Sequence, residues 1–494
     1  MRSCGILMPV FSLPSKGGIG TFGKEAYRFV DFLKLSKQSW WQILPLNPTN
    51  YGDSPYQSFS AYAGNPYFID PELLIEDGLL SEREFMSFDF GNNDSKVDYG
   101  KLYENRIKML KLAFKRFKPN KEFNAFCAEN AFWLDEYCLF MAIKNNNSDI
   151  AWENWEDGIR FRETEIIEQI KTENKDVLGF YAFVQFKFSE QWFKLKEYAN
   201  EKGIGIIGDI PIYVAYDSAD VWSEPEQFLL DSDLKPTAVA GCPPDAFCED
   251  GQLWGNPLYN WPLMKKEGFG WWKRRIGYAL KLYDMVRIDH FRGFESFYAI
   301  PYGQKTAKKG KWLKGPNVSL FNELKKEFGG DLPIIAEDLG FLTPEVMKML
   351  KKSGFPGMKV IQFAFDKSME SEYLPHNYTN NCVVYTGTHD NDTILGWCDT
   401  ASKEEVKLAA RYLNAGKNED FNWAMMRSAL SSVADTCILT MQDIIGLDSS
   451  ARINTPSTVG GNWVWRIDGG CINDWLANII ADNTEIFGRA PKKS

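Results

Sequence analysis

Eight short apolar runs recur along the chain, and polar or glycine-rich residues follow each of them. Each run is nearly continuous in hydrophobicity, which is typical of parallel strands buried on both faces and unlike the alternation of a half-exposed strand. The runs therefore predict eight strands of a parallel sheet, at Gly5–Pro9, Trp41–Leu46, Ile204–Ile210, Met285–Asp289, Ile334–Glu337, Lys359–Phe365, Val383–Thr388 and Cys437–Met441.

Helical spacing separates these runs. Residues 26–33 repeat apolar side chains on one helical face, and residues 188–199 do the same before Gly203. Thr343 followed by Pro344 is typical of a helix start, and Gly354 is typical of a helix end. Because helices alternate with eight strands, we predict an α/β fold of the (β/α)8 TIM-barrel type.

The predicted strands are unevenly spaced. About 155 residues separate the second strand from the third and more than 70 separate the third from the fourth, whereas a plain βα unit needs roughly 30. We therefore predict one catalytic barrel over residues 1–494, with partly helical insertions at about 47–203 and 211–283 that cover its top. Only about 50 residues follow the last strand, too few for a C-terminal β-sandwich of about 100 residues.

Composition narrows the classes of partner. The formal net charge of -10 disfavours nucleic acid, because phosphate binding needs clustered Lys and Arg. No apolar run approaches the roughly 20 residues of a membrane span, and the N-terminus has no signal-peptide pattern. The nine cysteines form no CxxC pair, which favours reduced thiols. We expect a cytoplasmic protein whose partner is neither nucleic acid nor membrane.

Aromatic residues are abundant, with 17 Trp, 21 Tyr and 35 Phe. The pairs Trp40–Trp41, Trp271–Trp272 and Trp463/Trp465 have two interpretations: core packing, which is the commoner role of a tryptophan, and stacking on the flat faces of sugars.

Acidic residues stand at the C-terminal ends of four predicted strands: Asp209, Asp289, Glu337 and Asp390. In a (β/α)8 barrel these strand ends converge on the active-site face. Four acids on one rim, each following an apolar run, are hard to explain by packing. They predict an active site built on carboxylates.

Such carboxylates suit the cleavage of a glycosidic bond, which develops positive charge on the sugar ring. Arg287 precedes Asp289 by two residues, so both side chains face the barrel interior, where the guanidinium keeps Asp289 ionised. The alternative for Arg287 is a buried ion pair without catalytic effect. His389 and Asn391 flank Asp390 and are candidates for binding sugar hydroxyls.

Other chemistries lack their patterns. The three histidines, at 290, 376 and 389, do not have metal-ligand spacing. No GxGxxG or GxxxxGK[ST] pattern supports nucleotide binding, and no GxSxG elbow supports Ser-His-Asp catalysis. We expect no metal and no cofactor.

A combination of longer segments resembles one family nearly from end to end. The segments include GILMPVFSLPSKGGIGTFG, GDSPYQSFSAYAGNPYFIDPELL, GDIPIYVAYDSADVW, PPDAFCEDGQLWGNPLYNW, RIDHFRGF, IIAEDLG, YTGTHDN and NTPSTVGGNWVWR. The chain is similar to the amylomaltases, the 4-α-glucanotransferases of glycoside hydrolase family 77 in the α-amylase clan.

The resemblance implies a role for each catalytic position. Asp289 resembles the nucleophile, Glu337 the acid/base, and Asp390 the third acid, which stabilises the transition state. Arg287 and His389 resemble residues that contact the sugar at the cleaved bond.

The resemblance also implies substrate-binding residues. Asp209 lies in the first shared motif of the clan, and Tyr56 stands where the family places a sugar-binding aromatic. The loop Asp245–Trp254, with Trp254 as a substrate contact, and the segment Gly460–Trp463 resemble two loops that cover the substrate. In the first loop CPPDAFCEDGQ departs from the family pattern at Cys242, Ala246 and Cys248, which puts acceptor preference in doubt.

The function implied is transfer of 1,4-α-glucan segments to the 4-hydroxyl of an acceptor glucan or glucose by a retaining double displacement, with malto-oligosaccharides as substrates. Two alternatives remain at this point, an α-1,4-glucan hydrolase of the α-amylase clan and an inactive glucan-binding protein. The short tail argues against the first, and the intact set of acids argues against the second. The oligomeric state is not predicted.

Overall fold

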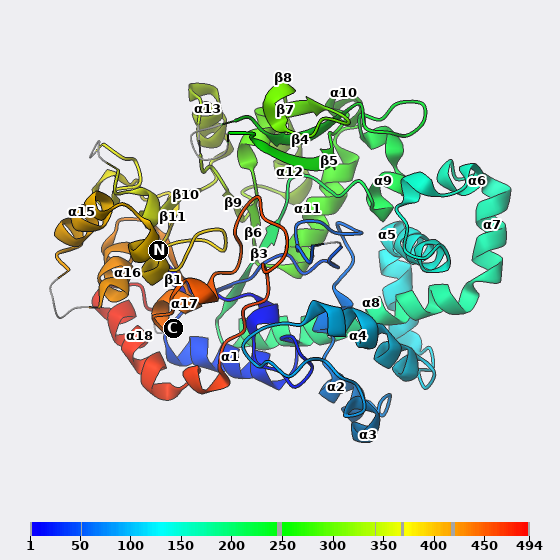
Figure 1. The fold of residues 1–494 in the computed structure, drawn as a ribbon, viewed down its shortest axis with the longest axis horizontal. Coiled ribbons are helices and arrows are strands. Elements are labelled where there is room, and N and C mark those ends of the chain that lie inside the picture. The colour runs from blue at the N-terminus through cyan, green and yellow to red at the C-terminus, as the bar shows by residue number, and fades with distance from the viewer. Residues whose placement is uncertain are drawn as a thin grey trace.

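A barrel of eight parallel strands forms the centre of the molecule (Figure 1). The computed structural model describes residues 2–50, 52–244, 249–340, 342–366, 370–415 and 420–492. The predicted α/β class and (β/α)8 barrel are confirmed. The barrel strands are β1 (Ser3–Leu7), β2 (Trp40–Gln42), β3 (Gly205–Ile210), β6 (Met285–Ile288), β9 (Ile334–Ala336), β10 (Gly357–Val360), β11 (Cys382–Tyr385) and β12 (Thr436–Thr440).

The strands follow the order β10-β11-β12-β1-β2-β3-β6-β9. Its two ends, β9 and β10, lie against each other, so the sheet curls into an almost closed barrel. The Ala336 N–H donates to the Pro356 carbonyl at 2.9 Å, and the Met358 N–H donates to Asp338 Oδ1 at 2.6 Å. At this seam a carboxylate takes the place of a backbone acceptor.

Each of the eight predicted strands overlaps an observed one, but several predicted C-terminal ends are wrong. The run Trp41–Leu46 yields only the short strand β2, and Ile361–Phe363 forms a 3-10 turn beyond β10. Ile43, Leu44 and Ile361 are buried although they lie outside the strands. The apolar signal therefore continues past the strand ends because loops pack over the barrel mouth.

Helices surround the barrel, and neighbours pack on one another: α1 on α8 and α18, α11 on α12, α12 on α13, and α16 on α14, α15 and α18. These helices are α1 (Lys24–Leu35), α8 (Lys175–Glu201), α11 (Gly270–Leu282), α12 (Val318–Phe328), α13 (Pro344–Ser353), α14 (Ile394–Thr400), α15 (Lys403–Leu413), α16 (Phe421–Ser431), α17 (Met441–Ile444) and α18 (Asp474–Ile486).

The local signals for helix α13 act as expected. The Thr343 side chain accepts a hydrogen bond from the Val346 N–H, and Gly354 ends the helix with φ +76°. Glycine readily adopts a left-handed backbone conformation because it has no Cβ to clash. Both ends of this helix can therefore be predicted from the sequence, the start from the N-cap threonine and the end from the glycine.

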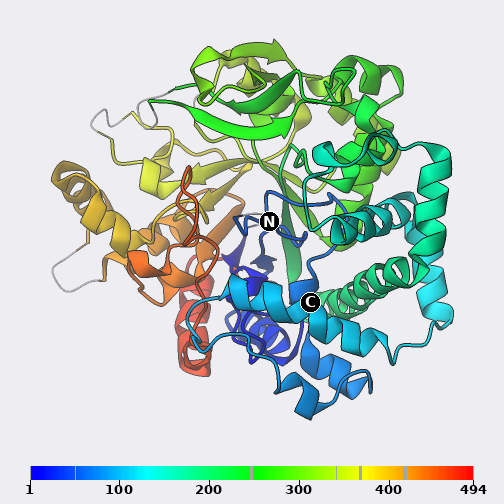
Figure 2. The same cartoon turned by 45° about the vertical axis from the view of Figure 1, so that its right-hand side comes forward.

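A helical lobe follows β2 and forms one side of the molecule (Figure 2). Its longest helix, α5, was not predicted, because its apolar residues do not gather on one face. The helices of the lobe are α2 (Pro71–Glu76), α3 (Glu82–Phe85), α4 (Tyr99–Phe114), α5 (Lys121–Asn146), α6 (Asp157–Arg160) and α7 (Thr164–Glu173).

A small antiparallel sheet lies above the barrel in Figure 1, in the order β5-β4-β7-β8. Strands β4 (Ala238–Cys242) and β5 (Gln252–Pro257) follow β3 in the chain, with the short helices α9 (Ala219–Ser223) and α10 (Trp261–Lys266) before and after them. Strands β7 (Ser296–Pro301) and β8 (Lys311–Lys314) follow β6 instead. The sheet thus joins two segments, of which only the first was predicted as an insertion.

The two predicted insertion ranges also contain α8 and α11, which pack around the barrel as its ordinary helices. The division of the chain into one unit with two insertions stays a prediction. After β12 the described residues form the helices α17 and α18 and no further strand. None of the helices that the structure describes is long and apolar enough to cross a bilayer.

Candidate active site

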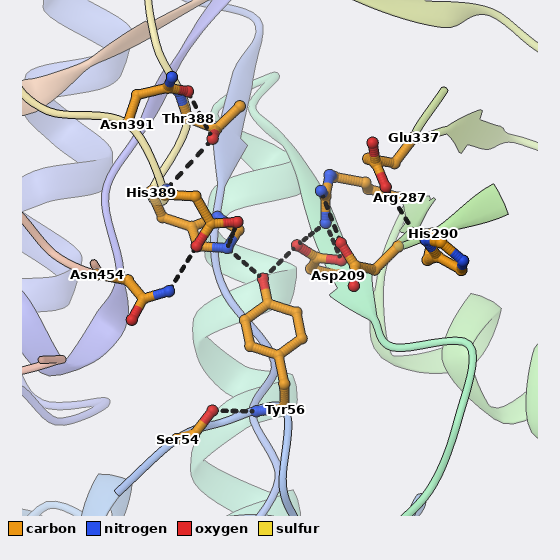
Figure 3. A network of polar contacts seen from close by, with 12 residues as sticks. Ser54, Tyr56, Asp209, Arg287, His290, Glu337, Thr388, His389, Asn391 and Asn454 are labelled. Atoms are coloured by element: carbon orange, nitrogen blue, oxygen red, sulfur yellow. Dashed lines mark hydrogen bonds and ion pairs between the residues drawn. The ribbon is translucent and has the colours of Figure 1, made fainter. Parts of the chain in front are cut away.

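The four predicted acids come together at the C-terminal end of the barrel, and Figure 3 labels two of them, Asp209 and Glu337. Asp209 lies in β3, while Asp289 and Glu337 directly follow β6 and β9, and these three strands are neighbours in the sheet. Asp390 reaches the same mouth from the loop after β11, which lies farther round the barrel. The convergence that the strand ends predict is therefore present.

Arg287 joins two of these acids. Its guanidinium donates from Nη1 to both Asp209 oxygens, at 2.8 and 2.6 Å, and from Nη2 to Asp289 Oδ1 at 2.9 Å. Its Nε–H points to Met358 Sδ at 3.4 Å. Arg287 and Asp209 are fully buried, whereas the Asp289 side chain is 31% exposed. Arg287 thus fixes one oxygen of Asp289, while the carboxylate stays accessible from the mouth of the barrel.

Tyr56 links the segment after β2 to the barrel. Its hydroxyl donates to Asp209 Oδ2 at 2.8 Å and lies 3.0 Å from His389 Nε2. Since the single hydroxyl proton goes to Asp209, the His389 Nε2–H donates to Tyr56. The two rings stack with centroids 5.3 Å apart, and the Trp463 ring packs against both.

Asp390 is held by residues that the sequence analysis did not single out. Asn454 donates from Nδ2 to Asp390 Oδ1 at 2.6 Å, and Arg452 donates to the Asp390 carbonyl at 2.7 Å. The Asp390 side chain remains 41% exposed, so these contacts and His389, 3.4 Å from Oδ2, set its orientation. Asn454 lies in the segment NTPSTVGG, whose resemblance to the family was its only signal.

Glu337 has a different environment from Asp289. Its Oε2 accepts the His290 N–H at 2.7 Å and its Oε1 accepts the Leu339 N–H at 2.8 Å. Burial and the neighbouring Asp289 charge raise the pKa of Glu337 to about 8, although Arg287 and the two backbone donors oppose the shift. Glu337 is therefore protonated at neutral pH.

His290 lies beside Glu337, and the Trp254 ring packs against the His290 ring. The His290 backbone is left-handed, with φ +52°, which turns its N–H toward Glu337. Its imidazole meets the Trp254 ring edge-on, with centroids 4.8 Å apart. Trp254, on β5, is half-buried and is the contribution of the small sheet to the site.

A family model described as 4-alpha-glucanotransferase matches residues 8–472. The chain belongs to the 4-alpha-glucanotransferase family. The resemblance predicted from the motifs is thereby confirmed.

Relatives of this family match nearly the whole chain. The 4-alpha-glucanotransferase of Clostridium butyricum is 51% identical over 486 residues, which cover 98% of this chain and 100% of the relative. That of Thermus thermophilus is 47% identical over 479 residues, 94% of this chain and 95% of the relative. The amylomaltase from Streptococcus agalactiae, solved in complex with acarbose, has a TM-score of 0.97 and 43% identity, covering 99% of this chain and 100% of its own.

Of the two segments predicted to cover the substrate, the first is only partly described. Residues 245–248 of the first loop, which include Ala246 and Cys248, lie outside the described residues, and Cys242 ends strand β4. Asn462 and Trp463 of the second segment line a hollow of about 250 Å³, together with Gly52, Ser54 and Asn454. The covering role of both loops stays a prediction.

Asn391 lies at the site but faces its own turn. Its Oδ1 accepts hydrogen bonds from the Thr388 N–H at 2.9 Å and from Thr388 Oγ1 at 3.0 Å. This contact closes the turn that presents His389 and Asp390. Sugar binding by Asn391 stays a prediction.

The aromatic pairs divide between the two interpretations. Trp41, Trp271 and Trp272 are buried in the hydrophobic core, where they cannot stack on a sugar. Trp463 is also buried, but its ring contacts the Tyr56–His389 pair. Among the described residues no group of His, Cys, Asp and Glu side chains could hold a metal ion.

Proposed function

We propose that the chain transfers segments of a 1,4-α-D-glucan to the 4-hydroxyl of an acceptor glucan or glucose, with retention of configuration. Asp289 is the nucleophile, Glu337 the acid and base, and Asp390 the acid that stabilises the sugar in the transition state. The family, the relatives named 4-alpha-glucanotransferase and the chemistry of these side chains support the proposal.

In the first half of the reaction, an Asp289 oxygen attacks C1 of the sugar while the bond from C1 to the leaving O4 breaks. Glu337 gives its proton to that O4, so the leaving chain departs with a hydroxyl. The product of this step is a glucosyl ester on Asp289 and an ionised Glu337.

In the second half, the acceptor 4-hydroxyl gives its proton to Glu337 and attacks C1. The ester bond breaks, Asp289 leaves as a carboxylate, and a new α-1,4 bond forms. Two inversions give net retention. Water in place of the acceptor would give hydrolysis.

One observation carries the assignment of roles: two neighbouring carboxyl groups have opposite environments. Asp289 is paired with Arg287 at 2.9 Å, whereas burial and Asp289 raise the pKa of Glu337 to about 8. A nucleophile has to be ionised and a general acid has to be protonated, so the ion pair of Asp289 with Arg287 and the raised pKa of Glu337 support these two roles.

Incubation with maltotriose tests the proposal. Transferase activity produces glucose together with oligosaccharides longer than maltotriose, as measured by chromatography with time. A hydrolase would give only shorter products, and an inactive binding protein would leave maltotriose unchanged. Either of these two results would overturn the proposed function.

A further inference from the structure

Asp338, next to Glu337 in the chain, is a buried carboxyl group that the proposed mechanism does not use. Its side chain is shielded from solvent, and its Oδ1 accepts the Met358 N–H at 2.6 Å. Burial raises the pKa of Asp338 to about 6, although the Met358 N–H and Lys359 oppose the shift, so the group is ionised at pH 7. Because burying a charge is costly, the position of Met358 is what this carboxylate can secure.

Gly357 leaves the room that the Asp338 carboxylate occupies at the seam between β9 and β10. A Cβ on Gly357 would lie 2.4 Å from Asp338 Oδ2 and 2.8 Å from Oδ1, closer than any side chain permits. One residue earlier, the Pro356 carbonyl accepts the Ala336 N–H at 2.9 Å. Asp338 therefore continues the pairing of the two strands where the backbone of β9 has ended, and it fixes the main chain of Met358.

The Met358 side chain extends from this fixed main chain to Arg287. Arg287 lies on β6 and Met358 on β10, the strands on either side of β9, and both residues are buried. The Arg287 Nε–H points to Met358 Sδ at 3.4 Å and has no other acceptor in the described part of the chain. The Nη atoms of the same guanidinium bind Asp209 and Asp289. Met358 thus supplies the third point that fixes the plane of the guanidinium.

A sulfur atom suits this place as an acceptor. A buried N–H without any acceptor is costly, whereas a thioether is only a weak acceptor. Met358 therefore satisfies the Arg287 Nε–H without drawing the guanidinium away from its carboxylate partners. An oxygen acceptor at the same position would bind the guanidinium more strongly and would compete with Asp289 for it.

We infer that Asp338 and Met358 are positioning residues for the nucleophile. The Asp338 carboxylate fixes Met358, and Met358 Sδ fixes the plane of the Arg287 guanidinium. Arg287 in turn holds Asp289 in the orientation for its attack on C1. This inference rests on the proposed function, in which Asp289 forms the glucosyl ester.

The test separates the attack by Asp289 from the proton transfer by Glu337. The donor is an α-maltotriosyl fluoride without the 4-hydroxyl on its terminal glucose, so it cannot act as an acceptor. Fluoride leaves as an anion and needs no proton from Glu337, so the first burst of fluoride release in stopped flow measures the attack. Cleavage of maltotriose, which needs both carboxyl groups, is measured alongside.

We expect Met358→Leu to slow the burst by about 5- to 10-fold, as for loss of one hydrogen bond. The donor concentration that gives half of the maximal burst rate should stay within about twofold, because the change does not touch the sugar. Leu conserves the volume of Met, so the variant should fold. Met349→Leu makes the same change at a buried position of α13 and should leave the burst as it is.

Asp338→Ala should slow the burst by a similar factor, because the Met358 main chain loses its acceptor. Asp338→Asn keeps an oxygen for the Met358 N–H and should recover most of that loss. The double variant Asp338→Ala/Met358→Leu should be no slower than the slower single variant, because both changes act through Arg287.

Three results would overturn the inference. The first is an unchanged burst in Met358→Leu. The second is a double variant in which the two factors multiply, since that would make the residues independent. The third is an unchanged burst in Asp338→Ala with slower cleavage of maltotriose, which would mean that Asp338 acts through Glu337.

If Asp338→Ala does not fold, Asp338→Asn takes its place, and the comparison of Met358→Leu with Met349→Leu still decides the outcome. Failure of the proposed function gives a different result. The unaltered protein would then give no burst of fluoride and would not lengthen maltotriose.

Discussion

At the scale of single residues, Arg287 sets the charge balance of the site. Burial disfavours its positive charge, but Asp209 and Asp289 outweigh burial and hold the pKa of Arg287 above its ordinary value. The guanidinium therefore stays charged, and each of its terminal nitrogens has a carboxylate partner. Replacing Asp289 leaves Asp209 to neutralise Arg287, so the fold should tolerate that change.

We expect Asp289→Asn to lose on the order of 10⁴-fold or more in transfer rate, as for removal of a nucleophile. Asn still offers an oxygen to Arg287, so the variant should unfold at a similar temperature. The measurement is the initial rate on maltotriose, with circular dichroism as the check of folding. Near-normal turnover by a folded variant would show that another group attacks the sugar.

Glu337 leads to a prediction about how the reaction rate depends on pH. Its carboxyl acts as an acid only when protonated, and its pKa is about 8, so the rate of the first half-reaction should fall as the pH rises through about 8. Glu337→Gln cannot ionise and should lose this alkaline limb together with most of the rate. A variant that kept substantial activity and an unchanged limb would exclude Glu337 as the acid.

The sequence predicted the acids because each lies at the C-terminal end of an apolar run, and the strand ends of a barrel converge. It did not predict the contact of Asn454 with Asp390. Asn454 is 64 residues from Asp390 in the chain, and nothing in its local sequence indicates that contact. Hydrogen-bond partners brought together by the tertiary fold leave no local periodicity to detect.

At the scale of elements, the barrel strands and the capped helix α13 were predicted because their signals are local: continuous apolar runs, an N-cap threonine and a terminal glycine. Strands β4, β5, β7 and β8 were missed. They are short, β4, β5 and β7 contain Gly or Pro, and the pairing of β4 with β7 joins residues about 60 positions apart in the chain.

Strand β5 carries the prediction for Trp254. Trp254→Ala removes an aromatic contact of about 1–2 kcal/mol, so kcat/KM for a glucose acceptor should fall by roughly 5- to 30-fold. Water should then intercept more of the glucosyl ester, and the share of free glucose from hydrolysis should rise. Product ratios from maltotriose provide the measurement.

Trp475→Ala is the matched control, since Trp475 lies on α18 and is 72% exposed. A Trp254→Ala variant that lost stability at an unchanged ratio of transfer to hydrolysis would indicate that Trp254 only packs the barrel top.

At the scale of the whole molecule, the two ends of the chain meet. Strand β1 pairs with β2 on one side and with β12 on the other, so the first and last barrel strands are hydrogen-bonded neighbours. Arg489, beyond α18, is fully buried and donates to the carbonyls of Leu430, Ser3 and Ser432. The C-terminal segment thereby fastens α16 to the start of β1.

We expect Arg489→Met to lower the free energy of unfolding by about 2–4 kcal/mol. All three carbonyls lose Arg489, but those of Leu430 and Ser432 keep Arg2 as a side-chain donor, whereas that of Ser3 does not. Urea denaturation gives the measurement. Arg411→Met, at an exposed position of α15, should change stability by less than about 0.5 kcal/mol, and equal effects of the two substitutions would contradict the prediction.

The small sheet has a consequence for exchanging parts between relatives. Its central strands, β4 and β7, pair Val239 with Ile300, yet β4 lies in the segment after β3 and β7 lies in the segment after β6. If residues 211–283 alone were transferred to a relative, β4 of this chain would pair with β7 of that relative. The position of Trp254 at the barrel mouth would then change. The segments after β3 and after β6 therefore form one exchangeable module, and chimeras within this family have to take both segments from the same parent.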